Sequence, residues 1–375
     1  MLKLNRIIIT LLLVSISAWP FATVSAQGEA PQIRITQVDN SKFPNVTVYV
    51  SVTNAAGEPV GIDPATIEIH ENGQLMKPVN IQGGGEAGGE AIPVTTMLVM
   101  DISGSMDKND KLAAAKEAAK SYVNQMLPGD QAGLIAYDTQ VYNVQPITTD
   151  IAALNSAIDG LKTGSDTAMY NALVEAEKAL ENVPGRKAVI VLTDGLDNRS
   201  QSTADDVVAG IGQSGLTISA IGFGDVGTVG QAGLNESALK SLAEQAGGIY
   251  GFATDSEALK GLYQQQSRVL QSEHKITYVS PSTLRDGINR SLTVSLTGAT
   301  ASAEGKYNPG GVLPEVSSRS WTLFVVILLG LLVLLFVPML VNLGTQSLSA
   351  AKRKPGSSRS VGRSSQPARG RIKLK

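Results

Sequence analysis

The chain has 375 residues, of which 43% are hydrophobic and 17% charged, with 38 glycines, two histidines and no cysteine. This length allows two domains and additional peripheral segments. The lack of cysteine excludes a disulfide framework, a thiolate metal site and a cysteine nucleophile, and two histidines leave little room for a histidine-based metal site. The formal net charge is −2, which is the sum of segments of opposite charge.

The N-terminal segment has the pattern of a secretory signal peptide over residues 1–26. Lys3 and Arg6 precede an apolar run at residues 7–18, and Ala26 ends a group of small residues typical of a cleavage site. The apolar run is too short to cross a hydrocarbon core of ~30 Å, which disfavours an uncleaved anchor. We therefore expect the following segment to be exported.

A second apolar segment lies near the other terminus. Residues 321–343 contain no charged side chain and consist largely of Leu, Val, Ile and Phe, which predicts one transmembrane helix. Residues 344–375 carry nine Lys or Arg and no Asp or Glu. The positive-inside rule places this basic tail in the cytoplasm, and its Ser, Gly and Pro content predicts disorder.

The charge distribution agrees with this topology. Between the signal peptide and the transmembrane segment there are 20 basic and 33 acidic residues. An acidic exported region is not expected to bind nucleic acid by charge. The expected location is thus the cell membrane, with a single span, an extracytoplasmic N-terminal region and a cytoplasmic tail.

Short runs with alternating polarity flank a longer segment of a different character. Residues 27–82 contain such runs and an Asn72-Gly73 turn signal, which predicts antiparallel strands of a small β-sandwich. Residues 83–93 have the composition of a Gly-rich linker. Residues 271–310 alternate again, and we expect their strands to complete the sandwich, so that the segment between them is an insertion.

Residues 94–270 alternate between strand-like and helix-like segments. Residues 95–100 and 188–193 are continuous apolar runs, typical of strands buried on both faces. Further strands are expected at 131–137 and 216–223, and helices at 111–126, 150–161, 171–180, 204–211 and 236–245. This alternation predicts an α/β fold with a mostly parallel sheet flanked by helices.

Two of the expected strands run into aspartates. Asp101 follows the first apolar strand and Asp194 follows the second, and ligand sites of doubly wound folds form at the carboxyl ends of such strands. Ser103 and Ser105 lie in a Gly-containing loop that can turn both hydroxyls toward Asp101. A set of oxygen donors without His or Cys favours Mg²⁺, with Mn²⁺ as its common substitute.

The motif Asp101-Xaa-Ser103-Xaa-Ser105 after an apolar strand resembles the metal-ion-dependent adhesion site (MIDAS) of von Willebrand factor type A (VWA) domains. That site adds a threonine before a helix and an aspartate after a later strand, which Thr167 and Asp194 match. The resemblance implies a Rossmann-like VWA fold. It also implies that the hydroxyls contact the metal, that the aspartates bind it directly or through water, and that one position is open for an acidic side chain of a partner.

The resemblance implies binding rather than catalysis. The expected function is that of a membrane-anchored extracytoplasmic protein that recognises a protein ligand through the metal, as in adhesion or another protein–protein interaction. An alternative is an assembly or maturation factor that works with an AAA-type ATPase. A hydrolytic enzyme is the third alternative, but Ser103 has no identifiable base, because neither His70 nor His274 belongs to the α/β segment.

Overall fold

The structure is a computed structural model. The chain forms two compact units, Met1–Ser317 and Ser318–Lys375. The expected signal peptide and basic tail lie outside the residues that it describes. The described residues are 31–85, 89–212, 215–224, 234–311 and 324–336.

The first unit contains a six-stranded sheet with the order β11-β10-β9-β6-β7-β8. Its neighbouring strands are parallel, except that β8 pairs antiparallel with β7 at one edge. The strands are β6 (Val94–Asp101), β7 (Gln131–Tyr137), β8 (Val141–Thr148), β9 (Arg186–Thr193), β10 (Thr217–Phe223) and β11 (Gly247–Ala253). Every residue of β6 and β9 is buried, as a parallel strand covered on both faces requires.

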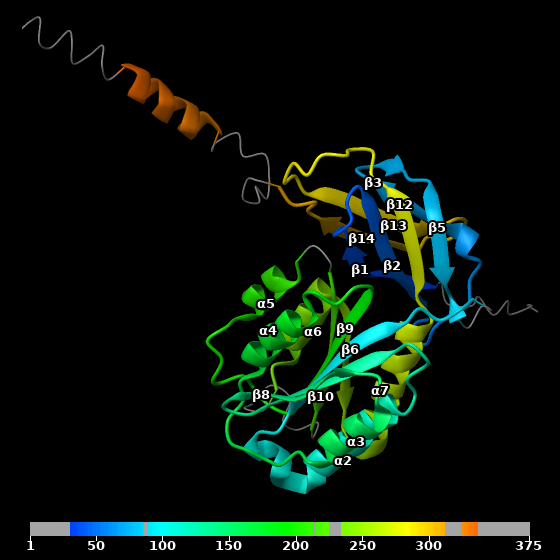
Figure 1. The fold of residues 1–375 in the computed structure, drawn as a ribbon, viewed down its shortest axis with the longest axis vertical. Coiled ribbons are helices and arrows are strands. Elements are labelled where there is room, and N and C mark those ends of the chain that lie inside the picture. The colour runs from blue at the N-terminus through cyan, green and yellow to red at the C-terminus, as the bar shows by residue number, and fades with distance from the viewer. Residues whose placement is uncertain (1–30, 86–88, 213–214, 225–233, 312–323, 337–375) are drawn as a thin grey trace, which may run out of the picture. The chain divides into compact units, whose positions relative to one another are not determined.

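Helices cover both faces of this sheet (Figure 1). One face carries α2 (Lys111–Val123), α3 (Ile151–Asp159) and α7 (Ser256–Gln271), and the other carries α4 (Met169–Leu180), α5 (Ala204–Gly210) and α6 (Glu236–Gln245). Successive residues of β6 point to opposite faces, so Leu98 packs in the first apolar core and Val99 in the second. The predicted α/β fold with a mostly parallel sheet is confirmed.

Two four-stranded sheets form a β-sandwich, with the orders β1-β2-β12-β5 and β14-β13-β3-β4. In chain order the strands are β1 (Gln32–Asp39), β2 (Asn45–Thr53), β3 (Ile67–Glu71), β4 (Gln74–Leu75), β5 (Pro78–Gly83), β12 (His274–Val279), β13 (Arg290–Leu296) and β14 (Ser302–Tyr307). β12 pairs with β2 and β5, and β13 pairs with β3. Strands from both sides of the α/β segment therefore share the same sheets.

Positive φ angles mark two close turns of the sandwich. Asn72 and Gly73, between β3 and β4, have φ values of 50° and 81°, which a two-residue hairpin turn of type I′ requires.

Gly83 ends β5 with a φ of 93°. A Cβ atom at Gly83 would lie 2.1 Å from the carbonyl oxygen of Glu273. The chain enters the α/β segment after Gly83 and returns from it at Glu273, so these two connections lie side by side. Only glycine fits at position 83.

A buried polar network joins the sandwich to the amino end of β9. The Arg186 guanidinium donates to both carboxylate oxygens of Glu273, just before β12, and to the side-chain oxygen of Gln37 in β1. It also lies 5.7 Å from the ring centroid of Tyr49 in β2. Arg186 and Glu273 are each 1% exposed. The inserted α/β segment is therefore held to the sandwich by more than its two chain crossings.

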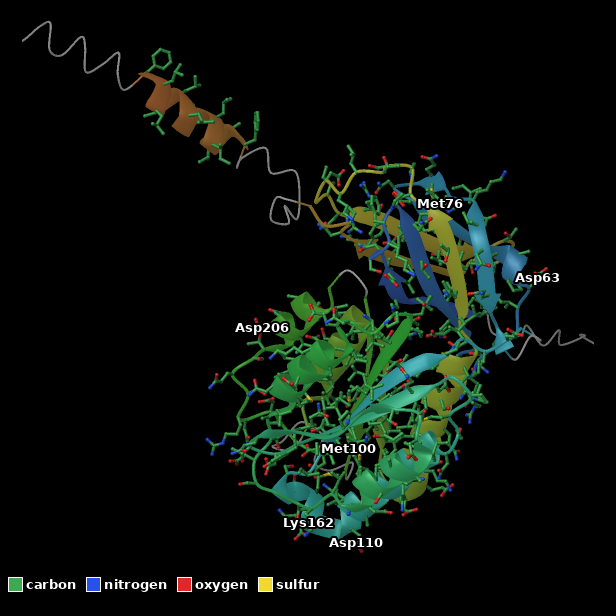
Figure 2. The ribbon with its side chains drawn as sticks, in the orientation of Figure 1. Asp63, Met76, Met100, Asp110, Lys162 and Asp206 are labelled. Carbon is green, nitrogen blue, oxygen red and sulfur yellow. The ribbon has the colours of Figure 1, made fainter. Side chains whose placement is uncertain are left out.

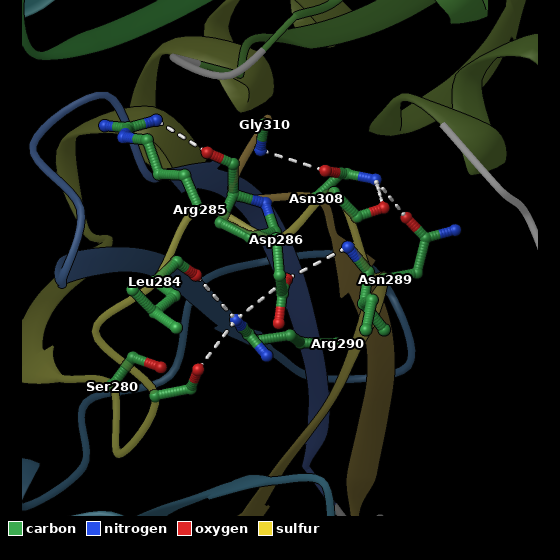
Figure 3. Close-up of polar contacts among 12 residues, drawn as sticks. Ser280, Leu284, Arg285, Asp286, Asn289, Arg290, Asn308 and Gly310 are labelled. Atoms are coloured by element: carbon green, nitrogen blue, oxygen red, sulfur yellow. Dashed lines mark hydrogen bonds and ion pairs between the residues drawn. The ribbon is translucent and has the colours of Figure 1, made fainter. Parts of the chain in front are cut away.

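Polar contacts also tie the loop after β12 to the segment after β14 (Figure 3). Arg285 donates to the carbonyl oxygen of Pro309 at 2.6 Å, and Asn308 donates to the side-chain oxygen of Asn289 at 2.8 Å. Arg290, the first residue of β13, donates to the carboxylate of Asp286 in the loop at 3.2 Å. These contacts fix the chain where it leaves the sandwich.

The second unit has a described helix over residues 324–336, whose apolar side chains are exposed. The expected span of 321–343 extends beyond this helix on both sides, outside the described residues. Within the described ranges, no helix has both the length and the apolar composition that crossing a bilayer requires.

Candidate functional site

The candidate site lies where two neighbouring strands end. β6 and β9 pair in parallel with Met100 opposite Leu192, so the next residues of both strands leave the sheet at the same edge. Asp101 is the last residue of β6, and Asp194 directly follows β9. In Figure 2, Met100 labels this part of β6, and Asp110 labels the loop after it that leads to α2.

Short hydrogen bonds link four of the five predicted residues. The Ser103 amide and the Thr193 hydroxyl each donate to one carboxylate oxygen of Asp101 at 2.8 Å. The Ser105 hydroxyl donates to Asp194 Oδ1 at 2.6 Å, and the two serine Oγ atoms lie 3.0 Å apart. Both aspartates are buried, with exposed fractions of 0% and 7%. The structure therefore gathers two carboxylates and two serine hydroxyls into one cluster.

The loop that carries the fifth residue lies against the same turn. The Gly104 amide donates to the carbonyl oxygen of Ser165 at 2.7 Å. Thr167 is 5% exposed, and its amide donates to Asn198 Oδ1 at 3.0 Å. Among the described residues, no hydrogen bond joins Thr167 to the other four. The structure thus places the Thr167 loop beside the cluster through backbone contacts, whereas Thr167 itself makes no described hydrogen bond to the other four residues.

A glycine permits this approach of the loop. A Cβ atom at Gly164 would lie 2.0 Å from Oδ2 of Asp138, the residue after β7. Any larger residue would displace the loop or the carboxylate. The motif around Thr167 therefore depends on this glycine for its position.

The electrostatics of the cluster are those of a buried carboxylate pair. Burial raises the pKa of Asp101 to about 6; hydrogen bonds from Ser103 and Thr193 oppose this rise, and the charge of Asp194 adds to it. The Lys111 ammonium, at the start of α2, donates to Asp194 Oδ2 at 2.7 Å. A cation is thus already paired with one of the two carboxylates.

Two residues that contact the cluster, Thr193 and Lys111, were not predicted from the sequence. Thr193 lies inside the Thr-Asp-Gly sequence that identifies Asp194, and its position beside Asp101 follows from the strand pairing. Lys111 has no recognisable signal, because it is one of several charged residues before a helix. Its contact with a residue 83 positions away arises only from the fold.

The donor chemistry of the cluster fits a hard divalent cation. All its side-chain donors apart from Lys111 are carboxylate or hydroxyl oxygens, the ligand types that Mg²⁺ and Mn²⁺ prefer. Within the described part of the chain, no group of three or more His, Cys, Asp or Glu residues could hold a metal. A cation at this place would take most of its protein ligands from hydroxyls, since only Asp101 and Asp194 supply carboxylates.

One family model and one solved structure are similar to this chain. Residues 96–196, which include all five predicted site residues, match the von Willebrand factor type A domain. A solved structure, "von Willebrand factor type A from Catenulispora acidiphila", has 17% sequence identity and a TM-score of 0.44, and the match covers 75% of this chain and 74% of that one.

Curated bacterial relatives cover about half of the chain. The UPF0353 protein MLBr01808 of Mycobacterium leprae is 30% identical over 232 residues, which are 55% of this chain and 68% of the relative. A UPF0353 protein of Mycolicibacterium paratuberculosis is 29% identical over 202 residues, or 47% of this chain and 60% of that protein. The matches thus span three fifths to two thirds of these relatives. The chain belongs to the VWA-domain proteins of the bacterial UPF0353 family.

Proposed function

We propose that this chain is a membrane-anchored, extracytoplasmic binding protein whose VWA domain holds a divalent cation and uses it to bind an acidic side chain of a partner protein. The observation that carries the proposal is the buried pair Asp101 and Asp194, bridged by the hydroxyls of Ser103 and Ser105 at the carboxyl edge of the sheet. Buried carboxylates are costly without a compensating positive charge. Mg²⁺ or Mn²⁺ at this place would supply that charge and a position for a partner carboxylate.

The chain's own residues would fix the geometry of such a site. The Ser103 amide and the Thr193 hydroxyl hold the two oxygens of Asp101, so this carboxylate has a defined orientation before any ligand arrives. Ser105 orients Asp194 in the same way. Thr167 would supply a further hydroxyl from its adjacent loop. Such pre-ordering reduces the conformational entropy that binding must overcome.

A binding role agrees better with the site than a hydrolytic role. Ser103 has hydroxyl and carboxylate neighbours, and both histidines belong to the sandwich, His70 in β3 and His274 in β12. Among the described residues around Ser103 there is thus no imidazole to activate it as a nucleophile. We therefore propose that the protein is not an enzyme.

Calorimetric titration of the purified full chain with Mn²⁺ and Mg²⁺ tests the metal site. Asp101→Ala is expected to abolish binding, because it removes one of two carboxylate ligands. Asp206→Ala is the matched control, since Asp206 caps α5 on the surface, and it is expected to bind like the unmodified protein. Equal heats for the unmodified chain and Asp101→Ala would reject the site.

The partner and its chemistry can be tested by affinity capture with and without a chelator. Proteins retained only with the metal are the candidates, and neutralising an acidic residue on such a protein is expected to release it. Metal-dependent capture of an AAA-type ATPase would instead support the alternative role in assembly or maturation.

The proposed topology can be tested with introduced thiols, since the chain has no cysteine of its own. Ala299→Cys lies on an exposed turn of the sandwich, and Ser357→Cys lies in the basic tail. In intact cells a membrane-impermeant maleimide is expected to label the first variant and not the second. Labelling of both or neither would contradict a single span with this orientation.

A further inference from the structure

Lys111 occupies an unusual place beside the candidate metal site. Its ammonium lies 2.7 Å from Asp194 Oδ2, and the side chains of Lys111 and Asp194 are 16% and 0% exposed. The other oxygen of Asp194 accepts from the Ser105 hydroxyl. Both oxygens of this buried carboxylate are thus engaged by groups of the chain itself. A metal that takes Asp194 as a ligand has to share it with Lys111 or displace the ammonium.

The position of Lys111 in its helix does not favour a lysine. Asn109 and Asp110, just before α2, have φ values of 55° and 53°, a left-handed conformation that Asn and Asp adopt more readily than other residues with a side chain. Asp110 caps the helix without a side-chain hydrogen bond. Lys111 is the first residue of α2, where the positive end of the helix dipole repels a cation. The ion pair with Asp194 offsets this repulsion.

A groove next to Lys111 offers its ammonium a second position. The groove has a volume of about 500 Å³ and runs between the start of α2 and the start of α7. Its lining includes the acidic residues Asp110, Glu117 and Asp255, as well as Lys111 itself. A lysine released from Asp194 would therefore enter a groove whose lining includes three carboxylates.

We propose that Lys111 and the divalent cation compete for Asp194, and that metal binding moves the Lys111 ammonium from Asp194 into this acidic groove. Lys111 is thus a positioning residue that balances the Asp194 charge and lowers the metal affinity of the site. A unit charge this close to a divalent cation opposes its binding even when solvent screens part of the interaction. This inference rests on the proposed metal site.

The first test compares Lys111→Gln with Lys178→Gln in the full chain. Lys178 lies on α4 and pairs with the exposed carboxylate of Glu175, neither of which lines the groove. Lys111→Gln is expected to bind Mn²⁺ about tenfold more tightly than the unmodified protein, with Lys178→Gln unchanged. In chelator, Lys111→Gln is expected to melt at a lower temperature, because Asp194 loses its counter-charge. Unchanged or weaker Mn²⁺ binding by Lys111→Gln would overturn the proposal.

A second test needs no variant, so it does not depend on how well Lys111→Gln folds. An amine-acetylating reagent is applied to the unmodified chain in chelator and in saturating Mn²⁺, and each lysine is quantified by mass spectrometry. Mn²⁺ is expected to speed acetylation of Lys111 severalfold and to leave that of Lys178 unchanged. Unchanged or slower acetylation of Lys111 overturns the displacement. If the unmodified chain binds no Mn²⁺, the proposed function and this inference both fail; Mn²⁺ binding without these changes overturns the inference alone.

Discussion

The buried ion pair between Arg186 and Glu273 offers a direct test of how the sandwich and the α/β segment are held together. Glu273→Gln keeps the shape of the side chain but removes its charge. The guanidinium would then stay buried with neutral partners, the side chain of Gln37 and the ring of Tyr49. The exposed pair Arg268–Glu58 is the matched control, because it also joins the α/β segment to the sandwich, here from α7, and Glu58→Gln is the same chemical change.

The burial of the two pairs sets the expected magnitudes. Arg186 and Glu273 are each 1% exposed, whereas Arg268 and Glu58 are 40% and 42% exposed. Removing one partner of a buried pair costs about 3–5 kcal/mol, since the remaining charge is left without compensation. Removing one partner of an exposed pair costs about 0–1 kcal/mol. Glu273→Gln is therefore expected to lower the free energy of unfolding several times more than Glu58→Gln.

Thermal and urea unfolding of the full chain, followed by circular dichroism, measure the difference. At about 2–4 °C per kcal/mol, Glu273→Gln is expected to lower the melting temperature by roughly 6–20 °C. The coupling between the sandwich and the α/β segment also weakens, so the unfolding transition is expected to broaden or split. If Glu273→Gln and Glu58→Gln destabilise the protein equally, the network does not carry the coupling that its burial implies.

Two further predictions concern other buried carboxyl groups. Burial raises the pKa of Glu177 in α4 to about 8, whereas the pKa of glutamate in an unfolded chain is ~4.3. Between these two pH values Glu177 keeps its proton in the folded state and loses it in the unfolded state. The free energy of unfolding therefore falls as pH rises through this range. Urea unfolding at pH 5 and pH 8 measures this dependence of stability on pH, and Glu177→Gln is expected to remove it. At pH 8 this variant is expected to be more stable than the unmodified protein by about 1 kcal/mol after solvent screening. An unchanged dependence on pH would contradict the prediction. In the sandwich, the hydroxyls of Tyr278 and Tyr307 both donate to the buried Glu71 carboxylate. Replacing either tyrosine by phenylalanine is expected to cost about 1.5–3 kcal/mol, and a loss below about 0.5 kcal/mol would show that the carboxylate does not depend on that hydroxyl.

Several elements are predictable almost to the residue, although α7 has no counterpart among the expected helices. The expected strand 131–137 and helix 236–245 coincide with β7 and α6. β9 begins at Arg186, two residues before the expected strand at 188–193. Two charged residues at the start of an apolar run indicate a solvent-exposed end. Both are buried here, and the partner of the Arg186 guanidinium is Glu273, 87 positions away, which no local pattern reveals.

Two strands of the main sheet escape prediction for opposite reasons. β8 is an edge strand with largely exposed side chains and Pro146 near its end, so it lacks a clear alternation. β11 contains three glycines, which locally indicate a turn. A Cβ atom at Gly248 would lie 2.1 Å from the carbonyl oxygen of Ile218 in β10. The glycine thus reflects close strand packing rather than a change of direction.

The candidate site was accessible from sequence because its residues follow strands. Asp101 and Asp194 each come directly after an apolar run, and neighbouring parallel strands bring their ends together. Lys111 and its contact with Asp194 depend instead on how the start of α2 packs over the sheet edge. The charge balance of the site is therefore the part that sequence alone does not provide.

The sandwich and the candidate metal site lie at opposite ends of the same strand. Arg186, at the amino end of β9, belongs to the network with the sandwich, whereas Asp194 follows the carboxyl end. Eight residues of strand separate them by about 25 Å, beyond the range at which exposed charges interact strongly in salt. Under the proposed function, we therefore expect the sandwich to support the VWA domain rather than to form part of its binding surface. Glu273→Gln, assayed below its melting temperature, is therefore expected to retain the metal affinity of the unmodified chain although its stability falls. If the metal affinity fell together with the stability, the contacts at the amino end of β9 would instead determine the position of Asp194.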